Sequence, residues 1–210
     1  MTPDIATAPV ARTRIDRTLS TRELMLSTAQ EAFLQHGYTE TSMDIVSHKA
    51  GVSKTTLYAH FESKEHLFNA VVEKVIGEYD RLLTELPVDS DAPFRDQLTE
   101  IGVMFTDILL DRRAASIVRL CIAEGGRIPR ASLDALSKTR RRMKLRLTEF
   151  LDGHGRAAGI SDPDGFCDLF LALINSDYQL DALLSSTMPG ADARRRHVEK
   201  AVALAMRLQN

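Results

Sequence analysis

Apolar residues recur at the spacing of an α-helix along almost the whole of this 210-residue chain. From residue 20 to residue 208 they recur every three or four positions, which gives each segment one apolar face. No segment shows the strict alternation that is typical of a half-buried strand. Glycine, proline and short polar residues separate the segments, as they commonly do between helices. The sequence therefore predicts an all-α fold of about nine helices.

The first two predicted helices have recognisable ends. Ser20 and Glu23 have the spacing of a capping box, in which each side chain bonds the backbone N–H of the other, and this predicts a helix that begins at Ser20. Gly37 is suited to the left-handed conformation that ends this helix. Thr41 or Ser42 is then placed to cap a second, shorter helix.

Two further helices complete the N-terminal part. Gly51 supplies a tight exit from the second helix, and Ser53 caps a third helix whose exposed face is rich in hydrogen-bonding side chains. Ser63 caps a long fourth helix, which is expected to run from about residue 64 to residue 86, where Pro87 stops it. This long helix would join the two halves of the chain.

The rest of the chain is also predicted to be helical. Its breaks fall at clusters of glycine, proline, aspartate and serine. Asp162 and Pro163 form a cap followed by a proline at the first helical position. The apolar stripes predict helices over residues 94–110, 112–124, 131–153, 163–184 and 191–208.

The charge balance excludes a globally basic protein. The 27 Lys and Arg residues nearly balance the 29 Asp and Glu residues, so the net charge is −2 and any nucleic-acid-binding surface must be a local patch. Cys121 and Cys167 lie far apart, which favours a reducing compartment, and we expect the cytoplasm. The sequence shows no recognisable signal peptide and no membrane-spanning run.

Motifs typical of enzymes are missing. The sequence contains no Gly-x-Gly-x-x-Gly, no P-loop, no His-Glu-x-x-His and no Gly-x-Ser-x-Gly. Its six histidines are scattered and suggest no metal site. We therefore expect neither an enzyme nor a protein that depends on a cofactor or a metal.

The clearest functional pattern lies where the second and third predicted helices meet, at Ala50-Gly51-Val52. Two short helices joined through a glycine turn have the layout of a helix-turn-helix, whose second helix enters the major groove of DNA. The polar side chains that this second helix would present are Lys54, Thr55, Thr56, Tyr58 and His60.

The stretch around this turn closely resembles the N-terminal domain of the TetR/AcrR family of transcriptional regulators. The resemblance covers about residues 22–70 and is densest over residues 51–67, where the spacing agrees without a gap. After residue 86 it reduces to helical character and length. The runs that carry it are His36-Gly37-Tyr38, Thr41-Ser42-Met43-Asp44-Ile45 and the whole of Ala50 to Leu67.

The resemblance implies DNA contacts for eight residues. Lys54, Thr55 and Thr56 occupy the first turn of the recognition helix, where side chains reach base edges. Outside such a motif these residues would be ordinary solvated surface, and His60 has a second interpretation as a capping or packing residue. The residues expected at phosphate and sugar groups are Thr41, Ser42, Tyr58, His60 and Lys64.

The chain is expected to divide into three parts: a flexible basic arm over residues 1–19, a helix-turn-helix domain over 20–66, and a helical effector-binding and dimerisation domain over 67–210. Arg12, Arg14 and Arg17 make the arm basic, and either a plain tail or a minor-groove arm fits them. The resemblance also implies that the last two helices pair with their two-fold mates in a four-helix bundle.

Candidate effector-binding residues combine apolar walls with a few polar groups, the usual composition of a small-molecule pocket. Each of them also has the plainer interpretation of a core residue. Their composition favours a largely apolar or aromatic small molecule over a highly charged one. They are Met104, Phe105, Ile108, Arg119, Cys121, Met143, Leu147, Phe166, Phe170, Asn175 and Tyr178.

These expectations combine into one predicted function. The protein would be a repressor that binds a palindromic operator as a homodimer and is released by a small-molecule effector. The alternative is a helix-turn-helix adaptor that is controlled by a protein partner and binds no small molecule. The sequence identifies neither the operator nor the effector.

Overall fold

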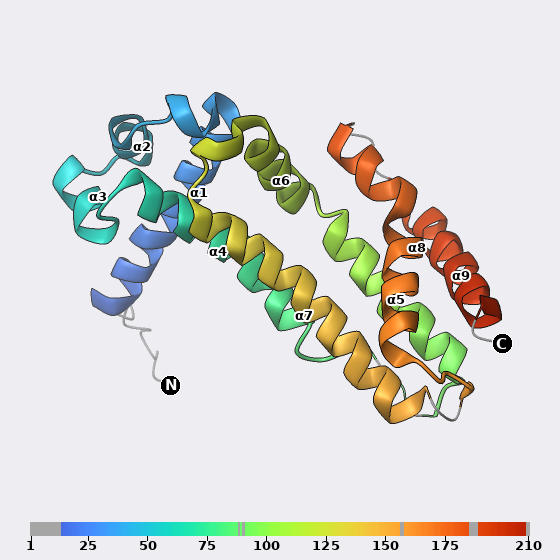
Figure 1. Ribbon diagram of the computed structural model, residues 1–210. Helices are drawn as coiled ribbons and strands as arrows, with labels where there is room; N and C mark the ends of the chain where they lie inside the picture. Colours follow the sequence, from blue (N-terminus) through green and yellow to red (C-terminus); the bar gives the residue numbers. More distant parts are fainter. Residues whose placement is uncertain (1–13, 88, 90, 156–157, 185–188, 209–210) are drawn as a thin grey trace, which may run out of the picture.

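The computed structural model describes residues 14–87, 89, 91–155, 158–184 and 189–208. Within these ranges the chain forms nine α-helices, one short 3-10 helix and no strand, which confirms the predicted all-α class (Figure 1). The elements are α1 (Arg14–Glu40), α2 (Met43–Ala50), α3 (Lys54–His60), α4 (Lys64–Leu82), α5 (Phe94–Leu109), α6 (Arg112–Glu124), η1 (Gly125–Arg127), α7 (Arg130–His154), α8 (Pro163–Leu184) and α9 (Ala191–Leu208).

The first helix begins earlier than predicted. Helix α1 starts at Arg14, so Ser20 lies inside the helix and the expected capping box with Glu23 is wrong. Because residues 14–19 continue the helix upstream, the free N–H groups that a cap would satisfy are not at Ser20. Arg14 and Arg17 therefore belong to α1 and not to an irregular arm, whereas Arg12 lies outside the described residues.

Two glycines turn the chain where the sequence predicts. Gly37 kinks α1 with φ 83°, and a Cβ built on it would lie 2.5 Å from an oxygen of the Glu124 side chain. Gly51 ends α2 with φ 65° and donates its N–H to the carbonyl of His48. Both positions need a residue that tolerates a positive φ, which glycine does without steric cost.

Serine caps begin the next three helices and confirm the predicted starts. The Oγ atoms of Ser42, Ser53 and Ser63 accept backbone N–H groups three residues later, at 3.2, 3.0 and 3.1 Å. Such caps satisfy N–H groups that the first turn of a helix leaves free. Local contacts therefore set where α2, α3 and α4 begin.

An aromatic cluster holds α1 against α4. The ring of Phe68 meets the rings of Phe33 and Tyr38 edge-on, with centroids 4.9 and 5.0 Å apart. Leu57 from α3 and Phe61 just after it are also fully buried, so the short recognition helix is anchored to the same core. This packing fixes α3 relative to the long helices.

Helix α4 runs from the N-terminal lobe along α7 and ends at Leu82, four residues before the predicted end (Figure 1). Arg146 of α7 donates to the carbonyls of Leu83 and Thr84, at 2.9 and 2.8 Å, and so satisfies backbone groups beyond the last turn. Arg142 of α7 also forms an ion pair with Asp80 at 2.6 Å. A residue about sixty positions away therefore shapes the end of α4.

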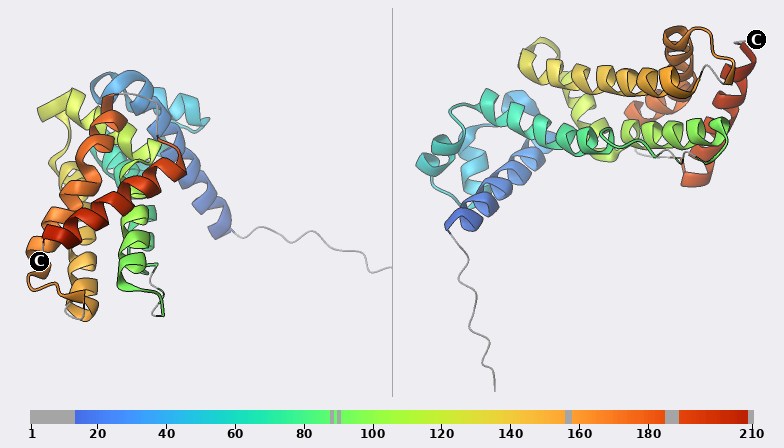
Figure 2. Two further views of the ribbon diagram at one scale, coloured as in Figure 1. Left: turned by 90° about the vertical axis from the view of Figure 1, so that its right-hand side faces the viewer. Right: turned by 90° about the horizontal axis from the view of Figure 1, so that it is seen from below.

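The C-terminal lobe confirms the predicted helices to within one residue at each described end. Helices α5, α8 and α9 pack closely because Gly102 of α5 has no side chain; a Cβ there would lie 2.6 Å from Val198 and 2.8 Å from Phe170. Figure 2 shows that helices α1–α3 form a lobe at one end of α4, apart from α8 and α9. Within the described residues, no helix is long and apolar enough to cross a membrane.

Candidate DNA-binding surface and ligand cavity

Helix α3 presents a polar face at one end of the molecule (Figure 1). Leu57 is fully buried beneath it, whereas Lys54 and Thr55 are exposed and 49% of Tyr58 is accessible. His60, partly exposed, lies in the last turn of the helix. A short helix that is anchored on one side and polar on the other has the form of a helix that reads base edges.

Lys54 is paired with a residue that the sequence reasoning did not select. Its ammonium lies 2.6 Å from a carboxylate oxygen of Asp44 on α2, and both side chains are 61% exposed. An exposed pair of this kind contributes about 0–1 kcal/mol, so it can be exchanged for a contact to DNA at low cost. The signal that could have identified Asp44 is its place in the first turn of the preceding helix.

Thr41 faces the protein interior. It is 1% exposed, and its hydroxyl donates to the carbonyl of Gly37 at 2.7 Å or of Ala32 at 3.2 Å. A buried hydroxyl that is already bonded cannot reach a phosphate, so we withdraw Thr41 from the DNA contacts and assign it to the junction of α1 and α2. Ser42, the next residue, is exposed and keeps its place at the N-terminus of α2.

Lys64 is also turned toward the protein. Its ammonium donates to the carbonyls of Tyr38 and Thr39, at 3.0 and 3.1 Å, and lies 4.6 Å from the centre of the Tyr38 ring. Two of its three N–H groups are therefore occupied. We assign Lys64 mainly to fixing the start of α4 against the end of α1, and the third N–H is left for a phosphate.

Thr56 is less accessible than Lys54 and Thr55 but is not buried. Its hydroxyl lies 2.8 Å from the Ser53 hydroxyl, and its side chain is partly exposed.

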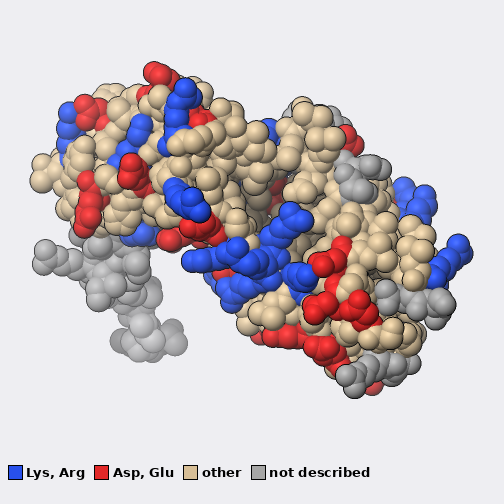
Figure 3. Space-filling model, viewed as in Figure 1, with Lys and Arg blue, Asp and Glu red and all other residues tan. Residues whose placement is uncertain are grey.

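Figure 3 shows positive and negative side chains interspersed on the visible face of the N-terminal lobe. This pattern agrees with the low net charge of the chain, so DNA binding there depends on few, well-placed groups and not on a broad basic patch.

Glu124, at the end of α6, connects the two lobes. Its carboxylate accepts the hydroxyl of Thr39 at 2.6 Å and the backbone N–H of the same residue at 3.2 Å, and its side chain is 12% exposed. The hydrogen bond from the Thr39 hydroxyl, together with backbone N–H groups and Arg127, lowers the pKa of Glu124. Sequence patterns missed this residue, because its partner lies 85 positions away.

The Glu124 contact predicts a pH-dependent contribution to stability. A carboxylate whose pKa is lower in the folded state stabilises the fold above its ordinary pKa, here 4.5, and loses that contribution as the pH falls through the folded value. At pH 7, E124Q should lower the thermal midpoint by about 2–4 °C, the shift that roughly 1 kcal/mol produces at this length.

Thermal melts of both proteins from pH 7 to pH 3 test this expectation. The difference between wild type and E124Q should begin to shrink below pH 4.5, the ordinary pKa, and be lost as the pH falls through the lower pKa of the folded state. The control E31Q, at an exposed position on α1, should melt like wild type throughout. A difference that stays constant down to pH 3 would contradict a role for the charge.

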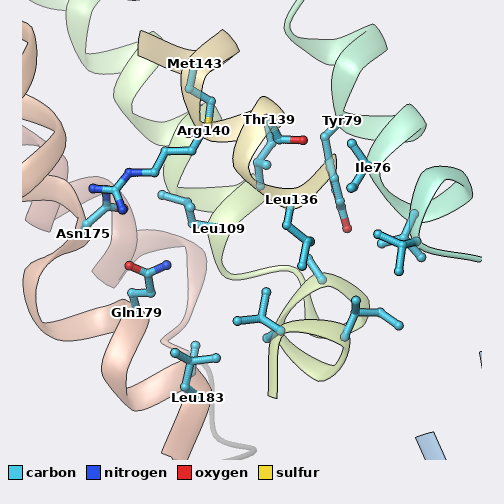
Figure 4. Close-up of a pocket in the computed structure, with 18 of the residues that line it drawn as sticks. Ile76, Tyr79, Leu109, Leu136, Thr139, Arg140, Met143, Asn175, Gln179 and Leu183 are labelled. Carbon is cyan, nitrogen blue, oxygen red and sulfur yellow. The ribbon is translucent and has the colours of Figure 1, made fainter. Parts of the chain in front are cut away.

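A cavity of about 180 Å³ lies in the C-terminal lobe between α4, α6, α7 and α8, with the end of α5 closing one side (Figure 4). Three of the predicted effector-binding residues line it: Ile108, Met143 and Asn175. Its wall also includes polar residues that the sequence reasoning missed, namely Tyr79, Thr139, Arg140 and Gln179. Burial and the Asp111 carboxylate raise the pKa of Tyr79, so its phenol stays protonated.

The other aromatic and aliphatic candidates do not line this cavity. Phe105, Leu147, Phe166 and Phe170 are fully buried in the core, where they pack helices together, so their prediction as cavity residues is not supported by the structure. Met104 lines a separate groove between α4 and α5. Apolar residues at helical spacing do not distinguish a cavity wall from ordinary core.

The remaining three candidates hold neighbouring helices together. Arg119 donates to the carbonyl of Ala182 at 2.7 Å. The Tyr178 hydroxyl donates to the carbonyl of Ala193 at 3.4 Å. Cys121 is a free thiol, and burial raises its pKa to about 11, so it stays neutral and unreactive at pH 7. None of them lines the cavity.

A helix-turn-helix on one lobe and a cavity in a second helical lobe are features of a DNA-binding regulator. Comparison with known families makes the class specific: residues 25–71 match the family described as "Bacterial regulatory proteins, tetR family", and residues 96–208 match "AefR-like transcriptional repressor, C-terminal domain". The chain belongs to the TetR/AcrR family of transcriptional regulators. Members of this family are regulators and not enzymes.

Individual relatives agree with this assignment. The chain is 31% identical to the HTH-type transcriptional regulator UidR of Escherichia coli K12 over 133 residues, which is 62% of each protein. It is 32% identical to the HTH-type regulator YhgD of Bacillus subtilis over 77 residues, 37% of this chain and 40% of YhgD. These matches span less than two thirds of the relatives.

Solved structures match over nearly the full length. A TetR-family regulator from Mesorhizobium loti superposes with a TM-score of 0.74 at 25% identity, and the match covers 94% of this chain and 98% of that one. The flavonoid-responsive regulator FrrA gives a TM-score of 0.73 at 27% identity over 90% of this chain and 96% of FrrA.

Proposed function

We propose that this protein is a transcriptional repressor that binds a palindromic operator as a homodimer and releases it when a small molecule occupies the cavity. The observation that carries the proposal is the exposed polar face of α3, held on a buried base. The repressor role is supported by the match of residues 96–208 to a repressor family.

The homodimer is proposed from exposed leucines on the last two helices. Leu180 and Leu184 on α8 are 58% and 78% exposed, and Leu204 and Leu208 on α9 are 44% and 60% exposed. The last two helices thus carry four of the eleven exposed large apolar side chains of the described residues, which supports an interface on these helices. Other apolar residues of these two helices fill the protomer's own core, among them Phe166, Phe170, Ile174, Val198, Val202 and Ala205.

Release by a small molecule is proposed from the helices that reach both the cavity and the DNA-binding lobe. Helix α6 lines the cavity with Ala115 and Ile117 and contacts Thr39 through Glu124 at its other end. Helix α4 lines the cavity with Val72 and continues back to the recognition-helix lobe. A ligand that favours a different tilt of these helices would change the spacing of the two recognition helices.

The expected strength of the switch follows from the usual coupling between two sites. About 1–3 kcal/mol of coupling gives a change in DNA affinity of roughly 5- to 150-fold. The flavonoid-responsive relative FrrA supports a small-molecule signal over the adaptor alternative, and so does the presence of a cavity.

Selection of DNA fragments by the purified full-length protein tests the proposal. We expect enrichment of a palindrome whose half-site centres lie about 34–36 Å apart, because two identical recognition helices then enter successive major grooves on one side of the duplex. The matching control is the same selection with a protein whose α3 face is replaced by alanine. Enrichment of no sequence, at salt concentrations that allow non-specific binding, would overturn the proposal.

A further inference from the structure

The ligand cavity contains buried polar atoms that the protein itself does not satisfy. Within the described residues, the Thr139 hydroxyl and Oδ1 of Asn175 are buried without a hydrogen-bond partner, and both residues line the cavity. Buried polar groups are nearly always hydrogen-bonded, because leaving one unpaired costs its full desolvation. Because these two atoms line a cavity, a bound molecule with hydrogen-bonding groups of its own can satisfy them there.

Arg140 gives the cavity a positive charge at one end. It is the only charged residue among those that line the cavity, and no ion-pair partner for it lies in the described part of the chain. Its guanidinium extends from α7 toward Asn175 and Gln179 on α8, as Figure 4 shows. By contrast, Arg142, two positions along α7, is paired with Asp80.

The guanidinium of Arg140, in an otherwise uncharged wall, favours a negatively charged ligand. A carboxylate matches the fork of an arginine with two parallel hydrogen bonds. A cationic molecule would find no counter-charge, because no Asp or Glu lines the cavity.

The size of the cavity limits the number of rings. An apolar cavity of about 150 Å³ holds one benzene molecule. A volume of about 180 Å³ therefore suits one aromatic ring with small substituents. The apolar wall, which includes Ile76, Leu109 and Leu136, faces such a ring (Figure 4). A flavonoid with three rings exceeds this volume.

The geometry points to a single-ring aromatic carboxylate with a ring hydroxyl as the molecule bound here. Its carboxylate pairs with Arg140 beside Gln179, its ring lies against the apolar wall, and its hydroxyl bonds to Thr139. This inference rests on the proposed effector function, since it names the chemical class of that effector. It also separates this protein from its flavonoid-responsive relative.

Calorimetry with the full-length protein, in the absence of DNA, tests the ligand class. The probes are benzoate and 4-hydroxybenzoate, with the neutral 4-hydroxybenzamide and the cationic benzamidine as matched shapes. We expect 4-hydroxybenzoate to bind best, benzoate more weakly, and 4-hydroxybenzamide at least tenfold more weakly than its acid. Benzamidine should not bind. Equal affinity for 4-hydroxybenzamide, or no binding of either acid at millimolar concentration, would overturn the inference.

Three variants locate the binding in this cavity. R140Q changes an exposed side chain and should weaken 4-hydroxybenzoate binding at least tenfold, whereas R141Q, at the next exposed position, should have no effect. T139V removes an unpartnered hydroxyl; it should lower affinity for 4-hydroxybenzoate while leaving the unliganded thermal midpoint equal or higher. Binding that R140Q leaves unchanged would overturn the inference.

These experiments test the ligand class separately from the effect of the ligand on DNA binding. If 4-hydroxybenzoate binds with the expected dependence on Arg140 yet leaves DNA affinity unchanged, the ligand class stands and the effector function fails. If no aromatic acid binds while the protein still selects a palindrome, the ligand class fails and the regulator function stands.

Discussion

Replacing Leu180 and Leu204 by glutamate is expected to convert the protein from a dimer to a monomer. Both leucines are largely exposed on a single chain, at 58% and 44%, and they lie on the two helices proposed for the interface. Burying one leucine contributes about 1.5–3 kcal/mol. Two-fold symmetry places four of these side chains in one interface, so their loss should weaken the dimer by at least about a thousandfold.

Light scattering after size-exclusion chromatography measures the effect directly. At micromolar concentration the wild type should have twice the 23.4 kDa mass of one chain, and the L180E/L204E protein that of one chain. L145E, which changes a leucine of α7 that is 55% exposed, is the matched control and should stay dimeric. The monomer should also lose operator affinity, because one recognition helix reads only one half-site. A dimeric double variant would place the interface elsewhere.

Most helix boundaries were predictable because the signals that set them are local. Ser42, Ser53 and Ser63 cap their helices with hydroxyls that reach only three residues ahead, and Gly51 ends α2 through its own backbone angle. Such contacts depend on a few consecutive residues, which is the range that a sequence pattern reports. The helices after residue 94 followed from their apolar stripes in the same way.

Several of the failures share a different cause, which is contact between distant residues. The end of α4 is set by Arg146, and Lys64 is turned inward by carbonyls at the end of α1. No pattern within one helix reports these partners. The bond between Thr39 and Glu124 was missed for the same reason.

The residues that line the cavity were hard to predict for the same reason. Sequence reasoning selected large apolar residues, but Phe166 and Phe170 fill the core. Arg140 was missed because a charged residue on a helix usually faces solvent. Which residues surround a space between four helices depends on how those helices cross, and periodicity alone does not give crossing angles.

Alanine at Lys54, Thr55 and Tyr58 together is expected to abolish specific operator binding. All three side chains are exposed on α3, and their removal leaves the buried Leu57 and the Ser53 cap in place. A good contact to a base edge contributes about 1–3 kcal/mol of discrimination. Loss of the base-edge contacts of Lys54 and Thr55, together with the sugar or phosphate contact of Tyr58, should therefore lower operator affinity by about a thousandfold or more, to the level of non-specific binding.

K138A is the matched control for charge. It removes one positive charge from an exposed position on α7, as K54A does on α3, and should retain full operator affinity. Far-ultraviolet circular dichroism and the thermal midpoint verify that the triple variant is folded. Its non-specific affinity should fall only slightly, because it loses a single positive charge.

Fluorescence anisotropy with the selected operator and a scrambled duplex, at one fixed salt concentration, tests most directly whether α3 reads DNA. Wild type should prefer the operator by about 10³-fold or more, and the folded triple variant should bind both duplexes equally weakly. A folded triple variant that keeps wild-type preference for the operator would contradict the role of α3 and the function proposed from it.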